Sequence, residues 1–316
     1  MKRSRFIAGG SAALGTVAVC GPAGAQAHAV LRLATIPLEV DATGWYALEL
    51  GYFRANGLDV TVDTFTSGPP ITAGIIGGTL DVGVASIGSL STAHARGLPI
   101  VALAPGGIYN GAAPTTVLAV AAASPLRSAK DLAGKTIAVQ TLGELGQFTT
   151  MSWIDNNGGD SKAVKFLEIP SSAMAEALAR GRIDVAFIAE PFYTQAKPAV
   201  RFFGAGYDGV SKRFLNTAWL ATRDWVERNP AVSKSFVTAM RQAAQWANQR
   251  RNLGASGAIL AKRTKIPPET IAKMQRAQFA LTLDPAMLQP VIDVSARYKV
   301  IPQAFPASEI IASVSP

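Results

Sequence analysis

The sequence LDVGVA at residues 80–85 is followed, about 103 residues later, by the similar sequence IDVAFI at residues 183–188. In each, a single aspartate precedes small and branched apolar side chains, a pattern typical of a buried β-strand. Recurrence of such a unit at a fixed distance indicates an internal repeat. The sequence therefore predicts a fold that is built from two copies of one supersecondary unit.

The same order of elements surrounds both stretches. In each copy a first strand leads into a helix that ends at an Asn-Gly pair, Asn56-Gly57 or Asn157-Gly158. Glycine beyond a helix end adopts the left-handed conformation that stops the helix. The predicted strands are 31–35, 59–65 and 80–85 in the first copy and 135–139, 163–169 and 183–188 in the second. Both copies have the plan βαβαβ.

Strands joined by helices run parallel with right-handed crossovers, so each copy predicts an open, mostly parallel sheet. A strand at 116–121 leads the chain out of the first half, and one at 218–222 leads it back. From Asp224 onward the pattern is helical, with helix starts at Pro267-Pro268 and Asp284-Pro285. We predict an α/β protein of two lobes, with a hinge of two crossings and a helical C-terminal segment.

The predicted boundaries follow from these crossings. They are residues 1–27 for a signal peptide, 28–118 with 219–316 for lobe 1, and 119–218 for lobe 2. The C-terminal segment is expected to pack on lobe 1.

The N-terminus predicts export to the periplasm. Lys2, Arg3 and Arg5 precede a weakly apolar stretch rich in Gly and Ala, as in a signal peptide, with cleavage expected near residue 25 or 27. Cys20 is the only cysteine, and Val19 before it is a poor match to a lipoprotein signal. The mature chain is therefore expected to have neither a lipid anchor nor a disulfide. The charge pattern leaves the export route, Sec or twin-arginine, unassigned.

Composition indicates a folded core and no nucleic-acid partner. Apolar residues make up 49% of the chain, and part of the net charge of +9 belongs to the predicted signal peptide. Cations at 250–251 and 262–265 fall in predicted helices without interleaved aromatic residues, which is typical of a solvated face. No apolar run of the mature chain reaches the length that spans a bilayer.

Motifs of enzymes are missing from the sequence. The only histidines are His28, at the predicted processed end, and His94. H-E-x-x-H, C-x-x-C, G-x-S-x-G and G-x-x-x-x-G-K-[ST] do not occur. The sequence therefore predicts a binding protein rather than an enzyme, with no metal and no cofactor.

Five segments carry a resemblance to a known family. They are GYFRANGLDV at 51–60, GTLDVG at 78–83, DLAGKTIAV at 131–139, GRIDVA at 181–186 and EPF at 190–192. In this order they resemble the periplasmic binding proteins of nitrate, sulfonate and taurine importers over nearly the whole mature length. The same superfamily includes thiamine-pyrimidine precursor proteins, among them a fungal enzyme that consumes its own histidine with iron. The cysteine-rich motif of that enzyme is absent here.

The resemblance implies a bilobal fold that closes by hinge motion on a ligand in the cleft. Ligands of open parallel sheets lie beyond the carboxyl ends of the strands, which predicts the same place. The strand-end loops are 35–43, 66–70 and 86–89 in the first half and 141–147, 170–172 and 189–193 in the second. The candidate ligand-binding residues are Pro37, Leu38, Trp45, Ser67, Gly68, Ser86, Ile87, Asn110, Thr141, Gly143, Gly146, Glu190 and Trp219. Most of the loops open helices, whose free N–H groups accept anions.

Several candidates have a second, purely structural interpretation. Ser67, Ser86 and Thr141 could contact ligand, cap helices, or do both. Asn110 could line the cleft floor or cap a turn. Both interpretations stay open for these residues.

Two tryptophans are open in the same way. Trp45 follows the first strand-end loop and could stack on a ligand or hold its helix on the sheet. Trp219 lies on the return crossing and has the same two interpretations. Ligand contact is favoured for Trp45.

The strand-end loops contain acids but no Lys or Arg. The acids are Glu39, Asp41, Glu144 and Glu190. A purely anionic ligand would be repelled by them, so a hydrogen-bond donor or cation on the ligand is expected. Glu190 is the acid expected to hold that donor, whereas Glu39 and Glu144 are expected to cap helices or face water.

The predicted function is capture of a small polar molecule, bearing a sulfonate or carboxylate and a nitrogen, for an ABC importer. The expected partners are that ligand and the importer permease, and the protein is expected to be a monomer. Two alternatives are a pyrimidine-precursor synthase and a sensor subunit that presents its ligand to a receptor kinase.

Overall fold

Two five-stranded sheets of the same strand order form the centre of the protein. The computed structural model describes residues 28–314, so the predicted signal peptide lies outside the described residues. The first sheet has the order β2 (Leu58–Thr64), β1 (Ala29–Thr35), β3 (Val82–Ser86), β12 (Thr217–Thr222) and β4 (Ile100–Pro105). The second has the order β8 (Lys165–Glu168), β7 (Thr136–Val139), β9 (Val185–Ala189), β6 (Thr116–Ala121) and β10 (Val200–Gly204). The predicted repeat is confirmed, because both copies have built the same sheet.

Pairing within the sheets explains the predicted crossings. β1 pairs in parallel with β2 and β3, and β7 pairs in parallel with β8 and β9. In each sheet, the strand that follows a crossing runs the other way: β12 is antiparallel to β3 and β4, and β6 is antiparallel to β9 and β10. The sheets are therefore mostly parallel, as predicted, with one reversed strand each.

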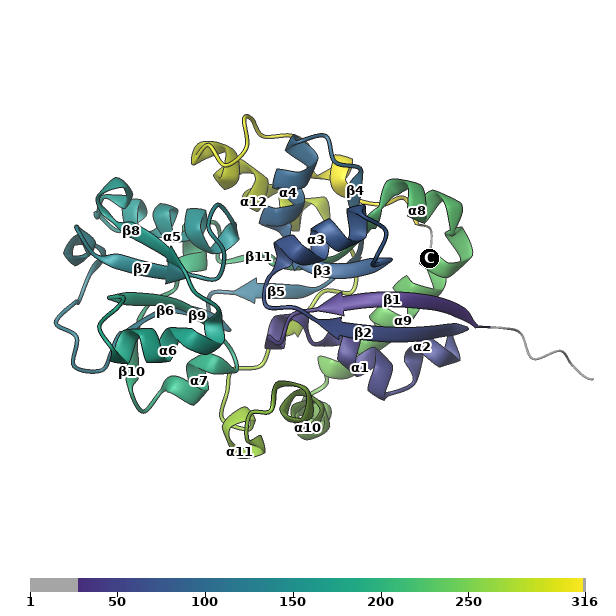
Figure 1. Ribbon diagram of the computed structural model, residues 1–316, viewed down its shortest axis with the longest axis horizontal. Coiled ribbons are helices and arrows are strands. Elements are labelled where there is room, and N and C mark those ends of the chain that lie inside the picture. The colour runs from purple at the N-terminus through teal and green to yellow at the C-terminus, as the bar shows by residue number, and fades with distance from the viewer. Residues whose placement is uncertain (1–27, 315–316) are drawn as a thin grey trace, which may run out of the picture.

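The two connections between the sheets pair with each other. A third small sheet consists of β11 (Arg213–Leu215), β5 (Gly107–Asn110) and β13 (Gln278–Phe279). β5 leaves the first sheet and β11 returns from the second, and Figure 1 shows them between the two sheets. The boundaries predicted at 118 and 218 fall inside β6 and β12, so the chain crosses a few residues before each of them.

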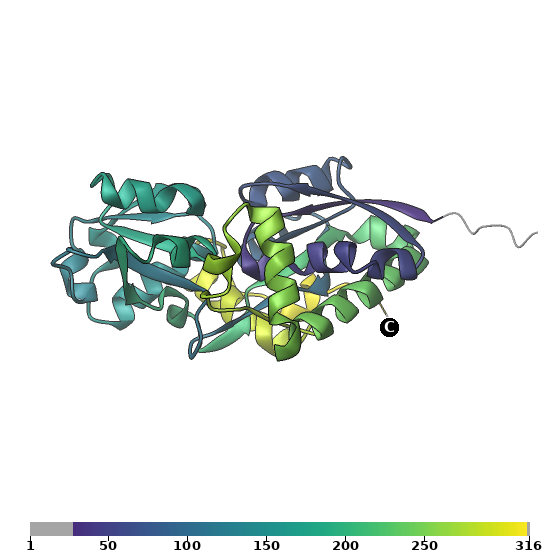
Figure 2. The same cartoon turned by 90° about the horizontal axis from the view of Figure 1, so that it is seen from below.

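Helices cover both sheets and build the C-terminal segment. Those of the first half and of the second are α1 (Thr43–Glu49), α2 (Tyr52–Ala55), α3 (Gly68–Ile76), α4 (Ile87–Ala95), α5 (Leu145–Asn156), α6 (Ser171–Ala179) and α7 (Phe192–Ala196). The C-terminal ones are α8 (Arg223–Arg228), α9 (Pro230–Ala247), α10 (Leu253–Thr264), α11 (Pro268–Ile271) and α12 (Pro285–Arg297). The short 3-10 helices are η1 (Glu39–Asp41), η2 (Ala129–Leu132), η3 (Ser161–Ala163), η4 (Gly206–Gly209), η5 (Arg250–Asn252) and η6 (Ala307–Ile310). We call each five-stranded sheet with its covering helices a lobe, and the two lobes lie side by side along the long axis (Figure 2).

Local sequence explains where several of these helices begin and end. Gly57 and Gly158 have positive φ angles of 75° and 78°, as expected for glycines that stop a helix. The Asp284 side chain accepts a hydrogen bond from the Ala286 N–H at the start of α12, and Pro285 is its first residue. The predicted starts at Pro268 and Pro285 are confirmed.

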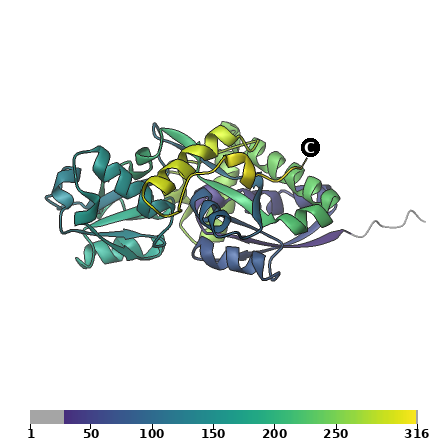
Figure 3. The ribbon, with the colours of Figure 1, turned by 90° about the horizontal axis from the view of Figure 1, so that it is seen from above.

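The C-terminal segment contacts both lobes, which differs from the prediction. α9 packs on α1 and α2 of the first lobe, but α12 packs on α4 of the first lobe and on α5 of the second. The Tyr298 hydroxyl, just after α12, donates a hydrogen bond of 2.7 Å to Asp155 Oδ2 in α5. Figure 3 shows α12, in yellow, lying across the junction of the lobes. None of the helices in residues 28–314 is long and apolar enough to cross a membrane.

Candidate functional site

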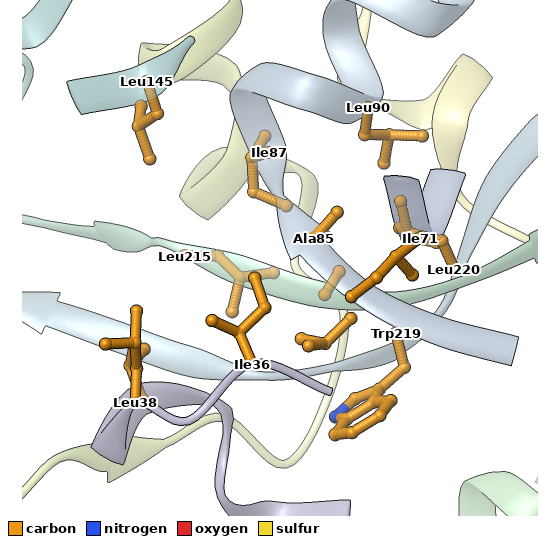
Figure 4. Packing of buried hydrophobic residues seen from close by; sticks show 14 of the residues in the cluster. Ile36, Leu38, Ile71, Ala85, Ile87, Leu90, Leu145, Leu215, Trp219 and Leu220 are labelled. Carbon is orange, nitrogen blue, oxygen red and sulfur yellow. The ribbon is translucent and has the colours of Figure 1, made fainter. Parts of the chain in front are cut away.

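A cavity of about 80 Å³ lies between the two lobes. Each of the six predicted strand-end loops contributes at least one lining residue. From the first lobe come Ile36, Leu38, Val40, Asp41, Gly68, Pro69, Ser86, Ser89, Asn216 and Thr217; from the second come Thr116, Gln140, Thr141, Glu144, Leu145, Gly146, Ser171, Phe187, Ala189 and Tyr207. Figure 4 shows Ile36 and Leu38 facing Leu145 across this junction. The carboxyl ends of both sheets therefore meet at one cavity.

Asp41 is the most deeply buried acid of the cavity. It lies at the end of η1, and only 2% of it is exposed. Its Oδ1 atom has no hydrogen-bond partner within residues 28–314. Burial raises the pKa of Asp41 to about 7, and the nearby Thr217 hydroxyl opposes part of that rise. Near neutral pH, Asp41 can therefore bind or release a proton.

Asn216 places a second acceptor without a partner in the same cavity. It precedes β12 and is 3% exposed, and its Oδ1 atom has no hydrogen-bond partner among the described residues. Tyr207, on η4, lies beside Asn216. Burial raises the pKa of the Tyr207 hydroxyl, and a hydrogen bond from the Asn216 side chain opposes part of that rise. Buried oxygens without donors are unfavourable, so both acceptors favour a ligand that donates.

Glu144 connects the two lobes at the cavity. Its Oε2 atom accepts hydrogen bonds from Ser89 Oγ at 2.5 Å and from Ser86 Oγ at 3.2 Å. Glu144 precedes α5 of the second lobe, whereas both serines lie at the start of α4 in the first. We call these three residues the inter-lobe bridge. Burial raises the pKa of Glu144, and the serine hydrogen bonds lower it in part.

Further hydrogen bonds cross the junction beside the cavity. The Gln140 amide Nε2 donates to the Thr66 carbonyl at 2.7 Å, and the Glu39 N–H donates to the Glu190 carbonyl at 3.1 Å. The two lobes are therefore in direct contact at several points beside the cavity.

Five of the thirteen candidate residues line the cavity. They are Leu38, Gly68, Ser86, Thr141 and Gly146. Ser86 lines the cavity, and its Oγ atom also accepts a hydrogen bond of 2.9 Å from the Ser89 N–H, so the predicted cap of α4 is present. Thr141 lines the cavity and does not cap α5, which begins after Glu144. Gly146 lies against the Phe187 ring, where a Cβ atom would come within 3.0 Å of it.

Both tryptophans belong to the core instead. Trp45 is 1% exposed and Trp219 is 0% exposed, and neither lines the cavity. The Trp219 indole Nε1 donates to Thr43 Oγ1 at 3.1 Å, and Figure 4 shows the ring among buried side chains. Trp45 and Trp219 therefore hold α1 on the first sheet, which is the structural interpretation of both residues, and neither side chain lines the cavity.

Glu190 also lies outside the cavity lining. Its carboxylate accepts hydrogen bonds from the Thr194 N–H at 3.0 Å and from Thr194 Oγ1 at 2.8 Å, so it caps α7. It is 1% exposed and does not line the cavity. Asp41 and Glu144 are the acids that line the cavity, and the expectation that Glu144 caps a helix or faces water is corrected, because its carboxylate accepts from Ser86 and Ser89.

The remaining candidates have local roles outside the cavity. Asn110 Oδ1 accepts from the Ala112 N–H at 3.1 Å, so it caps a turn, and the Gly143 N–H donates to Gln147 Oε1 at 2.7 Å. Ser67 precedes α3 without a side-chain cap, and Ile87 is buried in the core. These four and Pro37 do not line the cavity.

Glu39 is held by a cation on the outer side of the cavity. Arg276 Nε donates to Glu39 Oε1 at 2.7 Å, and its Nη2 atom donates to the Tyr46 hydroxyl at 3.1 Å. Burial raises the pKa of Glu39 despite this pairing. Glu39 was expected to cap a helix or to face water. Instead its side chain is buried and paired with Arg276.

Sequence reasoning missed several lining residues. Asp41 lies in a predicted strand-end loop. An acidic residue in a segment that the sheet topology brings to the cleft was the feature of the sequence that could have identified it as a lining residue. Asn216 is adjacent to the predicted return strand. Phe187 lies in a predicted strand and Tyr207 between strands, and neither position carries a periodic signal that separates a cavity wall from the core.

The fold and the cavity together define a bilobal periplasmic-binding-protein fold. Two solved structures share it: the alkanesulfonate-binding protein SsuA from Xanthomonas axonopodis pv. citri bound to MOPS, and the periplasmic nitrate-binding protein NrtA from Synechocystis PCC 6803. The first has a TM-score of 0.74 and 20% identity and covers 90% of this chain and 98% of its own. The second has a TM-score of 0.77 and 18% identity and covers 90% of this chain and 86% of its own.

The family profile described as NMT1/THI5 like matches residues 41–251. The chain therefore belongs to the NMT1/THI5-like family. A protein of Brucella abortus (strain 2308), named only as a binding protein, is 26% identical over 232 residues, which are 72% of this chain and 70% of that protein. The suspected family and the predicted fold are both confirmed.

One enzyme shares the fold. The desulfurization enzyme DSZB has a TM-score of 0.65 and 16% identity, and it covers 90% of this chain and 96% of its own. Fold alone therefore does not separate binding from catalysis, and the side chains of the cavity must decide.

Proposed function

We propose that this protein is an extracytoplasmic solute-binding protein that captures a small polar molecule and delivers it to an ABC importer. The observation that carries the proposal is the cavity of about 80 Å³ between two lobes, with hydrogen bonds from one lobe to the other beside it. A site divided between lobes that move is suited to reversible capture, because the ligand itself favours the closed state. The names of the sulfonate- and nitrate-binding neighbours support the same class of function.

Capture without catalysis is favoured by the cavity chemistry. The part of the lining that the structure describes contains no His, Cys or Lys side chain. His94 lies elsewhere, with its Nε2 atom 3.1 Å from Glu309 Oε2. An enzyme that consumes its own histidine would need that histidine beside the substrate, so the synthase alternative has no support from these residues.

Location and partners follow from the same proposal. The charged and apolar N-terminal pattern supports export with loss of residues 1–25 or 1–27, which the intact mass of the exported protein checks. The closed monomer would then present both lobes to an importer permease. The sensor alternative differs only in its partner, and ligand uptake by cells that lack this protein separates the two.

A ligand screen tests the proposal. Thermal shift over small sulfonates, carboxylates, amines and heterocycles should find a molecule that raises the melting temperature, because a ligand that binds only the folded state stabilises it. The same molecule should be bound with its nitrogen-bearing end buried. Chemical turnover of that molecule, or absence of any stabilising molecule in a broad metabolite panel, would contradict the proposal.

A further inference from the structure

Two buried acceptor atoms without donors meet in the cavity. Asp41 Oδ1 and Asn216 Oδ1 both lack a hydrogen-bond partner among residues 28–314, and both residues are at least nine-tenths buried. They come from separate elements, η1 and the residue before β12. Each would remain unsatisfied against an oxygen-rich anion, whereas a ligand with two N–H groups satisfies both.

The charge of the cavity favours the same ligand. Asp41 and Glu144 are its ionisable acids, and no Lys or Arg occurs among the described lining residues. The groups around Asp41 are the Tyr207 hydroxyl from η4 and the Thr217 hydroxyl from β12. Glu39 of the same 3-10 helix is paired with Arg276 and Tyr46 on the outer side. Helices α3, α4, α5 and α6 begin at the cavity and offer N–H groups to an anion, but no cationic side chain supports them, so the charges of the lining favour a cation over a sulfonate or a nitrate.

The walls and the size of the cavity restrict the ligand further. Phe187 and Tyr207 line it, with their rings 4.8 Å apart and at 82° to each other. Aromatic walls accept a planar cation over the ring face. The volume of about 80 Å³ is roughly half of the ~150 Å³ cavity that holds benzene in an engineered lysozyme. The buried end of the ligand must therefore be compact.

We propose that the cavity holds a planar amidinium or guanidinium group, which donates one N–H to Asp41 Oδ1 and another to Asn216 Oδ1. This inference rests on the proposed binding function and names the ligand class of that site. The hydrogen bond from a cationic N–H to the Asp41 carboxylate is charge-assisted, which makes it short and strong, and the planar group places its second N–H toward Asn216. Any acidic group of the same molecule lies toward the rim, where Pro69, Gln140 and Thr141 are partly or fully exposed.

Calorimetry with small probes tests the proposal. Acetamidinium and guanidinium at millimolar concentration are compared with methylammonium, acetate, nitrate and methanesulfonate at equal ionic strength. The planar cations should bind, and the anions should not. Asp41→Asn should weaken acetamidinium binding by about ten- to a hundredfold, and Asn216→Ala by a smaller factor.

Asp81→Asn is the control, because it also neutralises an acid of the first lobe but one that pairs with Arg32 outside the cavity. It should change affinity by less than about twofold. Circular dichroism of each variant checks that it is folded. Equal loss of affinity in Asp81→Asn and Asp41→Asn would overturn the assignment of Asp41.

Proton release gives a second readout that does not depend on affinity alone. Near pH 7 a part of the Asp41 carboxyls is protonated, since its pKa is about 7. A bound cation favours the carboxylate, so binding should release protons, and the measured heat should depend on the ionisation enthalpy of the buffer. Affinity should rise between pH 6 and 8 and level off above that. Asp41→Asn should reduce the buffer dependence, and Glu144, whose pKa burial also raises, accounts for what remains.

The outcomes separate this inference from the proposed function. Tight binding of an anion by the wild type, unaffected by Asp41→Asn, would overturn the cationic ligand but leave the binding protein intact. Binding of methylammonium as tightly as acetamidinium would overturn the planar, two-donor geometry. Failure of every small molecule to bind would overturn both proposals.

Discussion

Asp41 shows how burial changes the chemistry of a single residue. The sequence placed four acids in loops that meet at the cleft, but the structure gives them different surroundings: Glu190 caps α7, Glu39 pairs with Arg276, Glu144 bridges the lobes, and Asp41 keeps an oxygen without a partner. The side-chain direction depends on η1 and on the segment around Arg276, which are remote in sequence. The presence of acids near the site was therefore predictable from the sequence. Which of the four acids has an unpaired oxygen at the cavity was not.

The pH dependence of stability should report the burial of Asp41. Its pKa is about 7 when folded, above the value of 3.8 for a free aspartate. The folded protein therefore keeps a proton that the unfolded chain has lost between these two values. This stabilisation is complete below about pH 4 and is lost as the pH rises through 7. Without ligand, the free energy of unfolding should fall over this range.

Asp41→Asn should remove the Asp41 part of this slope, at most about 1.4 kcal/mol per pH unit. Urea unfolding at pH 5, 6, 7 and 8 measures it. Asp63→Asn, an exposed acid on β2, is the control and should leave the slope unchanged. Glu39, Glu144 and Glu190 also have raised pKa values and keep part of the slope in every variant. Parallel curves for Asp41→Asn and wild type would contradict the burial described here.

Helix starts show what can be predicted for an element. Ser67 and Ser86 occupy equivalent positions, each following a strand and preceding a helix, and the sequence does not distinguish them. Only Ser86 accepts a hydrogen bond from a backbone N–H, that of Ser89. The positions of α3 and α4 were predictable from the repeat, but the cap geometry depends on the local backbone and on Glu144 of the other lobe.

Alanine variants of the two serines should differ in stability. Ser86→Ala removes the α4 cap and should lower the free energy of unfolding by about 1 kcal/mol. Ser67→Ala removes a side chain without a cap hydrogen bond and should change it by less than about 0.5 kcal/mol. Thermal and urea unfolding of the folded variants measure both effects. Equal losses in the two variants would show that Ser86 does not act through the cap.

At the scale of the molecule, the repeat predicted the architecture. The strand order β2-β1-β3-β12-β4 is matched by β8-β7-β9-β6-β10, and the two crossings were recognised from the strands that follow each copy. The closeness of the lobes was not predictable, because it depends on contacts such as the inter-lobe bridge. The contact of α12 with both lobes was missed for the same reason: helical periodicity identifies an apolar face but not the surface that covers it.

Opening of the lobes should be controlled by the inter-lobe bridge. Glu144→Ala removes the acceptor shared by Ser86 and Ser89, and hydrogen bonds to a charged group contribute about 1.5 to 3 kcal/mol. The ratio of closed to open molecules should fall by roughly ten- to a hundredfold. Small-angle scattering without ligand should then give a larger radius of gyration.

Glu168→Ala is the control for scattering. Glu168 accepts a hydrogen bond from the Leu142 N–H within the second lobe, so its loss should leave the radius of gyration unchanged. Wild-type molecules that are open without ligand should close when ligand is saturating, and their radius of gyration should then decrease. A wild type and a Glu144→Ala variant with the same radius would mean that other contacts hold the lobes together.

The reversed strand of each sheet has a consequence for the order in which the protein folds. All five strands of the second sheet come from residues 116–204, so that sheet can form from one continuous segment. In the first sheet, β4 pairs with β12 and with no other of its five strands, and β12 ends at Thr222. The sheet of the first lobe can therefore be completed only after all five strands of the second sheet have been made. The first sheet stays incomplete until the chain has been made as far as Thr222.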